Sequence, residues 1–372
     1  MTHLLRALDL ALGALGSVSP NPPVGAVIVR RNKVVGEGFT QPPGGNHAEI
    51  VALEQAGEQA EDADMYVTLE PCSRHGRTPP CTDAIVAAGI SRVRVAMIDP
   101  NPEENGLGID QLQQAGLHVE ITPYRDEIDG ATKLIEAYRK HVASGKPFVT
   151  SKFAMSLDGK IASHTGSSTW ITGTSARNRA HVLRAECDAV VVGIGTVLAD
   201  DPRMTARDAA GELNAHQPLR VVLDSKGRVS EDAVIVSDGG RTLIACATID
   251  SAKRELLEQR GVEVEELPGE DGRVDVTALL TLLGSRGMTS VLVEGGGQVA
   301  GSLFDAGLVD KVAAFIAPVI VGGESAPGPV AGKGVAKIAN ALHLRDVTWE
   351  SVGVDMLVIG YPSIIPHTID FG

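Results

Sequence analysis

The first hydrophobic positions of the chain recur at helical spacing, at Leu4, Leu8, Leu12 and Leu15. This repeat predicts an amphipathic helix, which Asn21-Pro22-Pro23 then ends. Two β-rich runs between Val24 and Phe39 surround the polar turn Arg30-Arg31-Asn32-Lys33. Two such runs around a short polar turn predict a β-hairpin.

After the hairpin, helical and strand patterns alternate as far as residue 142. The apolar spacing predicts helices at 47–56, 81–88, 109–115 and 131–142, and strands at 65–69, 93–98 and 118–122. Alternation of this kind indicates an α/β fold in which helices cover a sheet.

The segment Ser144-Gly145-Lys146-Pro147 interrupts the alternation and predicts a domain boundary. A length of 372 residues favours two domains, which we expect at 1–145 and 146–372. A second alternating series follows the boundary, with helices at 176–185 and 276–283. Its apolar runs predict mostly buried strands at 189–192, 219–223, 242–246, 290–293, 312–316 and 354–359.

Composition narrows the class of protein. The chain is 43% hydrophobic and 22% charged, as in soluble globular proteins, and its sequence predicts neither a membrane span nor an export signal. A formal net charge of −14 argues against nucleic acid as the main partner. Four cysteines over this length favour a reduced, cytoplasmic setting. Of these, Cys187 and Cys246 lie in apolar stretches and are expected to be buried.

The other two cysteines belong to a constellation that suits catalytic zinc. His47, Cys72 and Cys81 supply three ligands of the kinds that tetrahedral zinc prefers, which leaves a fourth position for water. Glu49 could take a proton from that water and return it to leaving ammonia. The pattern matches the zinc deaminase signature H-x-E followed by P-C-x-x-C, except that eight residues separate the cysteines.

Two alternatives remain at this site. His75 lies between the cysteines and could be a ligand, or it could line a loop over the substrate. A His-x-Glu pair or a buried cysteine alone would also be unremarkable, so the inference rests on the combination. His47 and Glu49 are two residues apart and can face one metal only near the start of a helix.

The second half has a glycine-rich turn but no G-x-G-x-x-G after an opening strand. The predicted strand Val291–Val293 runs into Glu294-Gly295-Gly296-Gly297 and a predicted helix. Glycines and a helix N-terminus can admit a phosphate, although a simple tight turn is the alternative. Arg184 and Arg207 could grip a phosphate, while Lys152, Asp200 and Glu294 could hold sugar hydroxyls and manage protons. The alternative for each arginine is a solvated surface residue, and the alternative for Lys152, Asp200 and Glu294 is structural ion pairing.

The motifs of the first half resemble the deaminase part of the bifunctional riboflavin-biosynthesis deaminase/reductase family. They are Asn21-Pro22-Pro23-Val24-Gly25, His47-Ala48-Glu49, Leu69 to Cys81, and Asp99-Pro100-Asn101-Pro102. That family has a long loop between its cysteines, which accounts for the spacing. The resemblance implies a cytidine-deaminase-like three-layer domain in which His47, Cys72 and Cys81 hold zinc, Glu49 shuttles protons, and Asn21 and Arg77 contact substrate.

The second half is similar to the reductase part of the same family. The similar stretches are Lys152–Lys160, Ser168–Thr172, Leu183–Ala185 and Gly195–Arg203. The resemblance implies a dihydrofolate-reductase-like domain that uses NADPH. It implies substrate contacts at Ser168, Arg184, Met204, Arg207 and Glu294. It implies cofactor contacts at Ala154, Trp170, Thr196, Asp200, Ser225, Gly296, Gly297, Gln298, Val299, Ala300, Gly301 and Ser302.

The resemblance therefore implies a two-domain enzyme of riboflavin synthesis that deaminates a phosphoribosylaminopyrimidine and then reduces its ribosyl group. We expect a cytoplasmic homo-oligomer acting on a small molecule, without nucleic-acid or membrane partners. One rival is a deaminase that edits bases in RNA, which the net charge disfavours. Another is a zinc-stabilised binding protein with decayed sites, which Glu49 disfavours because structural zinc needs no proton shuttle.

Overall fold

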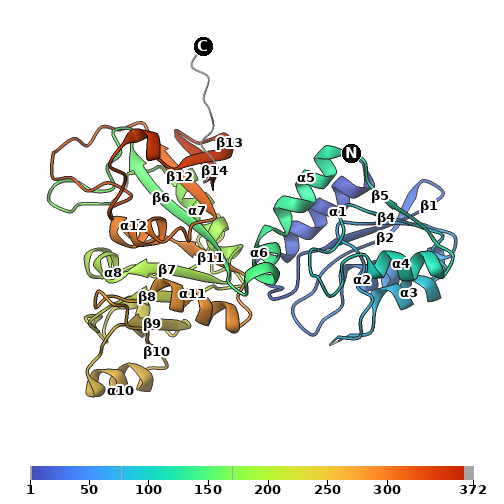
Figure 1. Ribbon diagram of the computed structural model, residues 1–372, viewed down its shortest axis with the longest axis horizontal. Coiled ribbons are helices and arrows are strands. Elements are labelled where there is room, and N and C mark those ends of the chain that lie inside the picture. The colour runs from blue at the N-terminus through green and yellow to red at the C-terminus, as the bar shows by residue number, and fades with distance from the viewer. Residues whose placement is uncertain (1, 77, 170, 364–372) are drawn as a thin grey trace, which may run out of the picture. The chain divides into compact units, whose positions relative to one another are not determined.

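The computed structural model describes residues 2–76, 78–169 and 171–363. The chain forms two compact units, residues 1–146 and 147–372 (Figure 1). The division between them falls within the Ser144–Pro147 segment.

The N-terminal unit is built on a five-stranded sheet in the order β2-β1-β3-β4-β5. The hairpin strands β1 and β2 are antiparallel, and β1 is also antiparallel to β3. The remaining pairs, β3 with β4 and β4 with β5, are parallel. The strands are β1 (Gly25–Arg30), β2 (Lys33–Phe39), β3 (Asp64–Val67), β4 (Arg92–Val95) and β5 (His118–Ile121).

Helices cover both faces of this sheet, so the unit has three layers (Figure 1). Successive side chains of a strand point to opposite faces, and β1 follows this rule. Ala26 and Ile28 pack with α2 and α3, whereas Val27 and Val29 pack with α1. The helices are α1 (His3–Ala11), α2 (Ala48–Ala56), α3 (Cys81–Ala87), α4 (Leu107–Gln114), α5 (Arg125–Leu134) and α6 (Glu136–Ser144).

Two predicted helices differ from the structure. The first α-helix ends at Ala11 and continues as a 3₁₀ turn over Leu12–Ala14. The stretch predicted as a single helix at 131–142 belongs to α5 and α6, because Ile135 leaves the helical conformation with φ −102° and ψ 18°. A break of this kind leaves the apolar spacing intact, so the spacing alone does not reveal it.

The second unit contains a nine-stranded sheet in the order β10-β9-β8-β7-β11-β6-β12-β14-β13. Its pairs are parallel from β10 as far as β12, and β14 and β13 add an antiparallel edge. The strands are β6 (Phe148–Ser156), β7 (Ala189–Gly193), β8 (Leu219–Leu223), β9 (Thr242–Cys246), β10 (Glu263–Glu266), β11 (Ser290–Val293), β12 (Lys311–Ala317), β13 (His343–Val352) and β14 (Asp355–Ser363).

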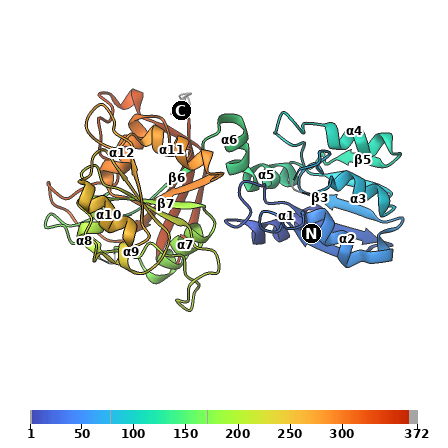
Figure 2. The ribbon, with the colours of Figure 1, turned by 90° about the horizontal axis from the view of Figure 1, so that it is seen from below.

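Both faces of the second sheet are also covered by helices (Figure 2). Val191 and Val221 pack with α11 and α12, whereas Val190 and Val222 pack on the opposite face with α8, α9 and α10. The helices are α7 (Thr174–Ala185), α8 (Ile194–Asp200), α9 (Val234–Ser237), α10 (Ser251–Gln259), α11 (Val276–Ser285) and α12 (Gly297–Asp305). Among the described residues, no helix is long and apolar enough to cross a bilayer.

Gly25 permits α1 to lie directly on β1. A methyl group at this position would overlap with the carbonyl oxygen of Ala7. We therefore expect Gly25→Ala to destabilise the N-terminal unit by about 1–3 kcal/mol or more, as overpacked core positions do. Hydrogen exchange under increasing urea should show earlier exposure of Gly25–Arg30 with little change at Leu219–Leu223.

Gly13→Ala is the matched control, because its methyl group would lie 3.8 Å from the Phe39 ring, an ordinary contact. Equal protection of β1 in the Gly25 and Gly13 variants would contradict the packing argument.

Candidate functional site

Three metal-ligating side chains converge from separate elements of the N-terminal unit. His47 is the N-cap of α2, Cys72 follows β3, and Cys81 is the first residue of α3. Nδ1 of His47 lies 3.5 Å from Sγ of Cys72 and 3.3 Å from Sγ of Cys81. All the ligand atoms lie within 4.8 Å of one another.

This geometry fits zinc. Bonds of about 2.3 Å to sulfur and about 2.0 Å to nitrogen, at tetrahedral angles, place the two ligand atoms roughly 3.6 Å apart. The measured separations of 3.3 and 3.5 Å are close to that value. A set of one imidazole and two thiols leaves one position of a tetrahedron for water or substrate.

Glu49 lies beside the three ligands, as its position near a helix start predicts. It occupies the first turn of α2 and is 4% exposed. Burial, assisted by the nearby Cys72 sulfur, raises the pKa of Glu49 to about 7. A carboxyl group with such a pKa can both accept and donate a proton near neutral pH.

The cysteine environment favours a thiolate. The hydrogen bond from the Cys81 thiol is the main cause that lowers the pKa of Cys72 to about 4, and His47 assists. The backbone N–H of Cys81 also donates to Sγ of Cys72 at 3.4 Å. The hydrogen bond with Cys72 in turn raises the pKa of His47. These contacts stabilise negative charge on sulfur, the form that binds metal.

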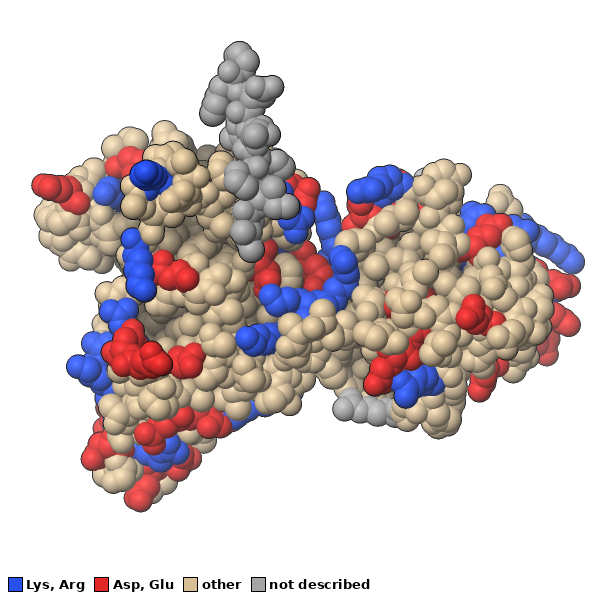
Figure 3. Space-filling model, viewed as in Figure 1, with Lys and Arg blue, Asp and Glu red and all other residues tan. Residues whose placement is uncertain are grey.

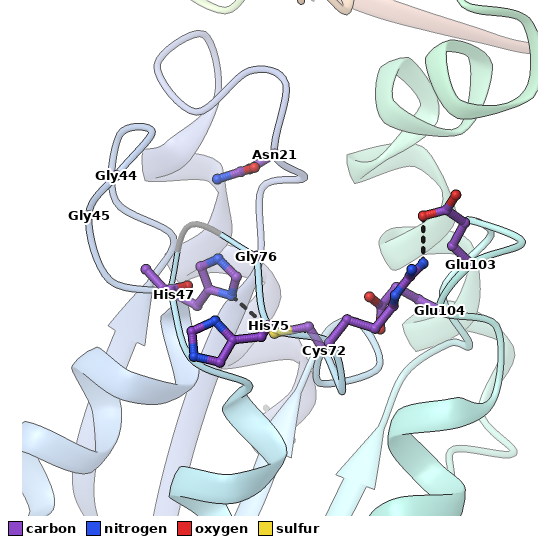
Figure 4. Close-up of a pocket in the computed structure, with 11 residues that line it drawn as sticks. Asn21, Gly44, Gly45, His47, Cys72, His75, Gly76, Glu103 and Glu104 are labelled. Carbon is purple, nitrogen blue, oxygen red and sulfur yellow. Dashed lines mark hydrogen bonds and ion pairs between the residues drawn. The ribbon is translucent and has the colours of Figure 1, made fainter.

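A cavity of about 400 Å³ opens onto His47 and Cys72. Asn21 and His75 both line it (Figure 4), whereas Arg77 lies outside the described residues. Within the described part of the chain, the metal-ligand cluster comprises His47, Cys72 and Cys81 without His75. The remaining lining residues are Gly44, Gly45, Arg74, Gly76, Thr78, Glu103 and Glu104.

In the second unit, Glu294 accepts hydrogen bonds from two cations. Nε of Arg184 lies 2.5 Å and Nη2 of Arg184 2.9 Å from its carboxylate, and Nζ of Lys152 lies 3.1 Å away. Burial is the largest influence on Glu294 and opposes its ionisation, but Arg184 and Lys152 together lower its pKa. The cluster of three carries a surplus positive charge, which suits an anionic ligand.

Residues 204–207 lie against this cluster. Nη1 of Arg184 donates to the carbonyl oxygen of Thr205 at 3.0 Å, and Nδ1 of His181 lies 3.0 Å from the same oxygen. Met204 is buried with φ 53°, and Nε of Arg207 donates to the Thr205 hydroxyl at 3.2 Å. The structure therefore brings together the predicted residues Arg184, Met204 and Arg207.

The glycine-rich turn lies next to Thr196, since the Gly296 N–H donates to Oγ1 of Thr196 at 3.3 Å. Two of its glycines also have a packing role that the sequence does not reveal. A methyl group at Gly297 would come within 2.7 Å of the Gly328 carbonyl oxygen, and one at Gly301 would overlap with Ala331. The segment 328–332 therefore covers this part of α12, which also carries Gln298, Val299, Ala300 and Ser302.

The other predicted cofactor and substrate residues lie at several places in the second unit. Oγ of Ser168 donates to Asp200, the last residue of α8, at 2.8 Å. Ala154 lies on β6, and Oγ of Ser225 accepts from the Val274 N–H at 3.3 Å. Trp170 lies outside the described residues.

Sequence reasoning missed some residues around both sites. His181 stands three positions before Arg184 on α7, and that helical spacing could have indicated a shared face. Glu70, two residues before Cys72, and Glu104, which accepts from the Ser73 N–H, are also missed. Glu70 lies within the Leu69 to Cys81 motif, but the motif alone gives it no role, and nothing in the local sequence distinguishes Glu104 from an ordinary surface carboxylate.

Family models match both parts of the chain. Residues 2–97 match the cytidine and deoxycytidylate deaminase zinc-binding region, and residues 147–358 match the RibD C-terminal domain.

Relatives match almost the whole chain. The riboflavin biosynthesis protein RibD of Synechocystis is 42% identical, with 97% of this chain and 95% of the relative covered. The solved structure of Acinetobacter baumannii RibD is 36% identical with a TM-score of 0.85, covering 97% and 98% of the two chains. A deaminase/reductase structure from Thermotoga maritima is 34% identical with a TM-score of 0.82, covering 97% and 98%.

Fold and site thus define a bifunctional enzyme with a cytidine-deaminase-like domain that uses Zn²⁺ and a dihydrofolate-reductase-like domain that uses NADPH. The chain belongs to the RibD family and has the deaminase and reductase activities of riboflavin biosynthesis.

The three-ligand geometry leads to a direct test. We expect the purified chain to hold one zinc ion and Cys81→Ala to lose it, because two remaining ligands cannot retain the metal through gel filtration. Elemental analysis measures the zinc content. Cys246→Ala is the matched control, since that buried thiol lies in the second unit, and retention of zinc by Cys81→Ala would exclude Cys81 as a ligand.

Proposed function

We propose that the domain at 1–145 deaminates 2,5-diamino-6-(5-phosphoribosylamino)pyrimidin-4-one to 5-amino-6-(5-phosphoribosylamino)uracil. The domain at 146–372 then reduces the ribosyl group of that product to ribityl with NADPH. The convergence of His47, Cys72 and Cys81 beside the buried Glu49 carries the first assignment. The name of the Thermotoga maritima relative, a diaminohydroxyphosphoribosylaminopyrimidine deaminase and 5-amino-6-(5-phosphoribosylamino)uracil reductase, supports both substrates.

In the first reaction, His47, Cys72 and Cys81 hold the zinc ion. A zinc ion bound there would lower the pKa of a coordinated water to about 7. Glu49 takes a proton from the attacking water as a C–O bond forms at the amino-bearing ring carbon. Glu49 then returns the proton to the amino nitrogen, and the C–N bond breaks to release ammonia. Asn21 and Arg77 contact the substrate.

In the second reaction, NADPH supplies the hydride, and the chain orients the sugar and exchanges protons. Lys152, Asp200 and Glu294 hold the sugar hydroxyls and manage the proton that accompanies opening of the ribose ring. The surplus positive charge of the Lys152, Arg184 and Glu294 cluster favours an anionic substrate. Arg207 contributes further positive charge. Ser168 and Met204 complete the substrate contacts.

NADPH binds along the residues that surround the glycine-rich turn. Thr196, Asp200 and the N-terminal half of α12 form the central part of this surface, with Ala154 on β6 and Ser225 after the end of β8. The contacts on α12 and its N-cap are Gly296, Gly297, Gln298, Val299, Ala300, Gly301 and Ser302. Trp170 is a further contact to NADPH in this proposal.

A small molecule, not nucleic acid, is the substrate that the charges favour. The net charge is −14, and on the face shown in Figure 3 basic residues are interspersed with acidic ones. Binding to a nucleic-acid backbone depends on clustered Lys and Arg. Turnover of the free pyrimidine without tRNA binding would exclude an RNA-editing role.

We also propose a cytoplasmic homo-oligomer. The edge strand β13 presents an exposed Trp349, and Val354 in the following turn is 75% exposed. An edge with unpaired backbone groups and large apolar side chains is suited to pairing with a second copy. The molar mass in solution tests this assembly.

The role of Glu49 leads to a test of the deaminase. Glu49→Gln should lower ammonia release at least about 100-fold, since general acid–base catalysis contributes roughly that much or more. Zinc content and NADPH oxidation with the deaminated substrate should stay unchanged. Glu54→Gln on the same helix is the control, because Glu54 bonds only the Asn46 side chain among the interactions described. Full ammonia release by the zinc-loaded Glu49→Gln variant would refute the mechanism.

The Lys152 and Glu294 pair leads to a test of the reductase. Lys152→Ala should lower substrate-dependent NADPH oxidation about 100-fold, because it removes a positioned proton-transfer group. Glu294→Gln should have a comparable effect, since it leaves Arg184 and Lys152 without their shared counter-charge. Ammonia release reports the intact deaminase, and Lys253→Ala, which breaks a Lys–Glu pair elsewhere in the unit, is the control. Normal NADPH oxidation in the Lys152 variant would reject its role.

A further inference from the structure

We propose that Glu70 is a positioning residue that fixes the zinc ligand Cys72 against the segment Asp99–Ile109, which forms one wall of the deaminase pocket. The inference deepens the proposed function of the first site and rests on it. The Asp99-Pro100-Asn101-Pro102 motif has no part in the proposed mechanism, and Glu70 bonds neither metal nor substrate in it.

Glu70 places one buried carboxylate at the centre of four backbone N–H groups. Its Oε2 atom accepts from Asp99 at 3.0 Å and Gly106 at 3.0 Å. Its Oε1 atom accepts from Gly108 at 2.8 Å and Ile109 at 3.2 Å. The side chain is 4% exposed.

These bonds use the full accepting capacity of the group. An ionised carboxylate has about four lone-pair sites and no donor. Three of the four N–H groups belong to the start of α4, where backbone donors lack partners within the helix. Glu70 therefore caps α4 from a distant point of the chain, and charge-assisted bonds of this kind are stronger than neutral ones.

A second carboxylate bridges the same two segments in the opposite direction. Glu104, from the pocket wall, accepts from the Ser73 backbone N–H at 3.1 Å and from the Ser73 hydroxyl at 3.2 Å. Cys72 thus lies between two residues, Glu70 and Ser73, that are each bonded to the 99–109 segment. A movement of that segment would be transmitted to the Cys72 sulfur.

The two segments also approach so closely that only glycine fits between them. A methyl group at Gly108 would overlap with the carbonyl oxygen of Pro71, the residue directly before Cys72. The four N–H bonds offset the cost of burying the Glu70 carboxylate. The contact leaves the Cys72 backbone little freedom to shift.

The wall that Glu70 holds reaches the substrate cavity. Glu103 and Glu104 line the pocket beside Cys72, and Glu103 pairs with Nη1 of Arg74 at 2.5 Å (Figure 4). One carboxylate therefore sets the position of both a metal ligand and a pocket wall. Residues that orient metal ligands in this way typically contribute about 10–100-fold to metal affinity or activity.

Cobalt titration of the full-length chain tests the proposal, because Co²⁺ bound to thiolates absorbs visible light. In Glu70→Gln, the amide places two N–H donors against backbone donors. We expect the dissociation constant for Co²⁺ to rise about 10–100-fold. The thiolate-to-cobalt absorption should change, and kcat for ammonia release should fall. NADPH oxidation with the deaminated substrate should stay at the wild-type rate.

Glu127→Gln is the matched control for loss of a buried carboxylate. Glu127 is 2% exposed in the same unit and accepts from the Thr2 and Thr122 hydroxyls, away from the zinc site. If Glu70→Gln lowers the melting temperature as Glu127→Gln does but keeps the wild-type cobalt affinity and spectrum, the proposal is overturned. Failure of the wild-type chain to bind Co²⁺ would instead overturn the proposed zinc site itself.

Ser73→Ala is a second test of how Cys72 is held, for the case that Glu70→Gln does not fold. It removes one bond of the second bridge and leaves the Ser73 backbone N–H in place. We expect a smaller rise in the cobalt dissociation constant, a few-fold, with the same spectral change. A wild-type constant and spectrum in a folded Ser73→Ala would contradict the clamped position of Cys72.

Discussion

The deaminase unit depends on stabilising negative charge on sulfur in a largely buried place. The chain meets this constraint by placing Sγ of Cys72 against the start of α3, where the Cys81 N–H donates to it, and beside the His47 imidazole directly before α2. Helix N-termini favour negative charge, and backbone donors there are free to stabilise it. The three-layer arrangement serves this purpose, because it brings the ends of β3, α2 and α3 to one point.

In the reductase unit, positive charge has to be stabilised away from water. Glu294 holds two partly buried cations together, since the side chains of Arg184 and Lys152 are 17% and 15% exposed. Withdrawing either cation from water without a counter-charge would carry a desolvation cost. One carboxylate offsets that cost for the pair but does not neutralise its charge. The remaining positive charge is available to a substrate phosphate or to a developing negative charge. The two units therefore use buried carboxylates differently, one to exchange protons and one to organise cations.

Sequence alone could identify those site residues that form an uncommon combination of residue types. A histidine, two cysteines and a glutamate in this order have few other uses, so the zinc cluster could be predicted before the fold. The packing of Gly297 and Gly301 against residues 328–332 could not, because glycine after a strand is equally suited to a phosphate. Arg184 and Glu294, 110 positions apart, also form their pair only through the order of strands in the sheet.

The wide cysteine spacing has a structural reason. Cys72 follows a strand and Cys81 begins a helix, so the residues between them are free to leave the metal and line the cavity. In a short C-x-x-C turn the second cysteine would follow at once, and the backbone itself would hold both sulfur atoms in place. With eight residues between them, the turn itself does not supply that restraint. On one side the start of α3 holds Cys72, because the Thr82 N–H and hydroxyl donate to its carbonyl oxygen and the Cys81 N–H donates to its sulfur. On the other side, the bonds of Glu70 and Ser73 to the 99–109 segment add a second restraint. The loop between Cys72 and Cys81 leaves room for the cavity, and the buried Glu70 carboxylate helps to keep Cys72 in place beside it.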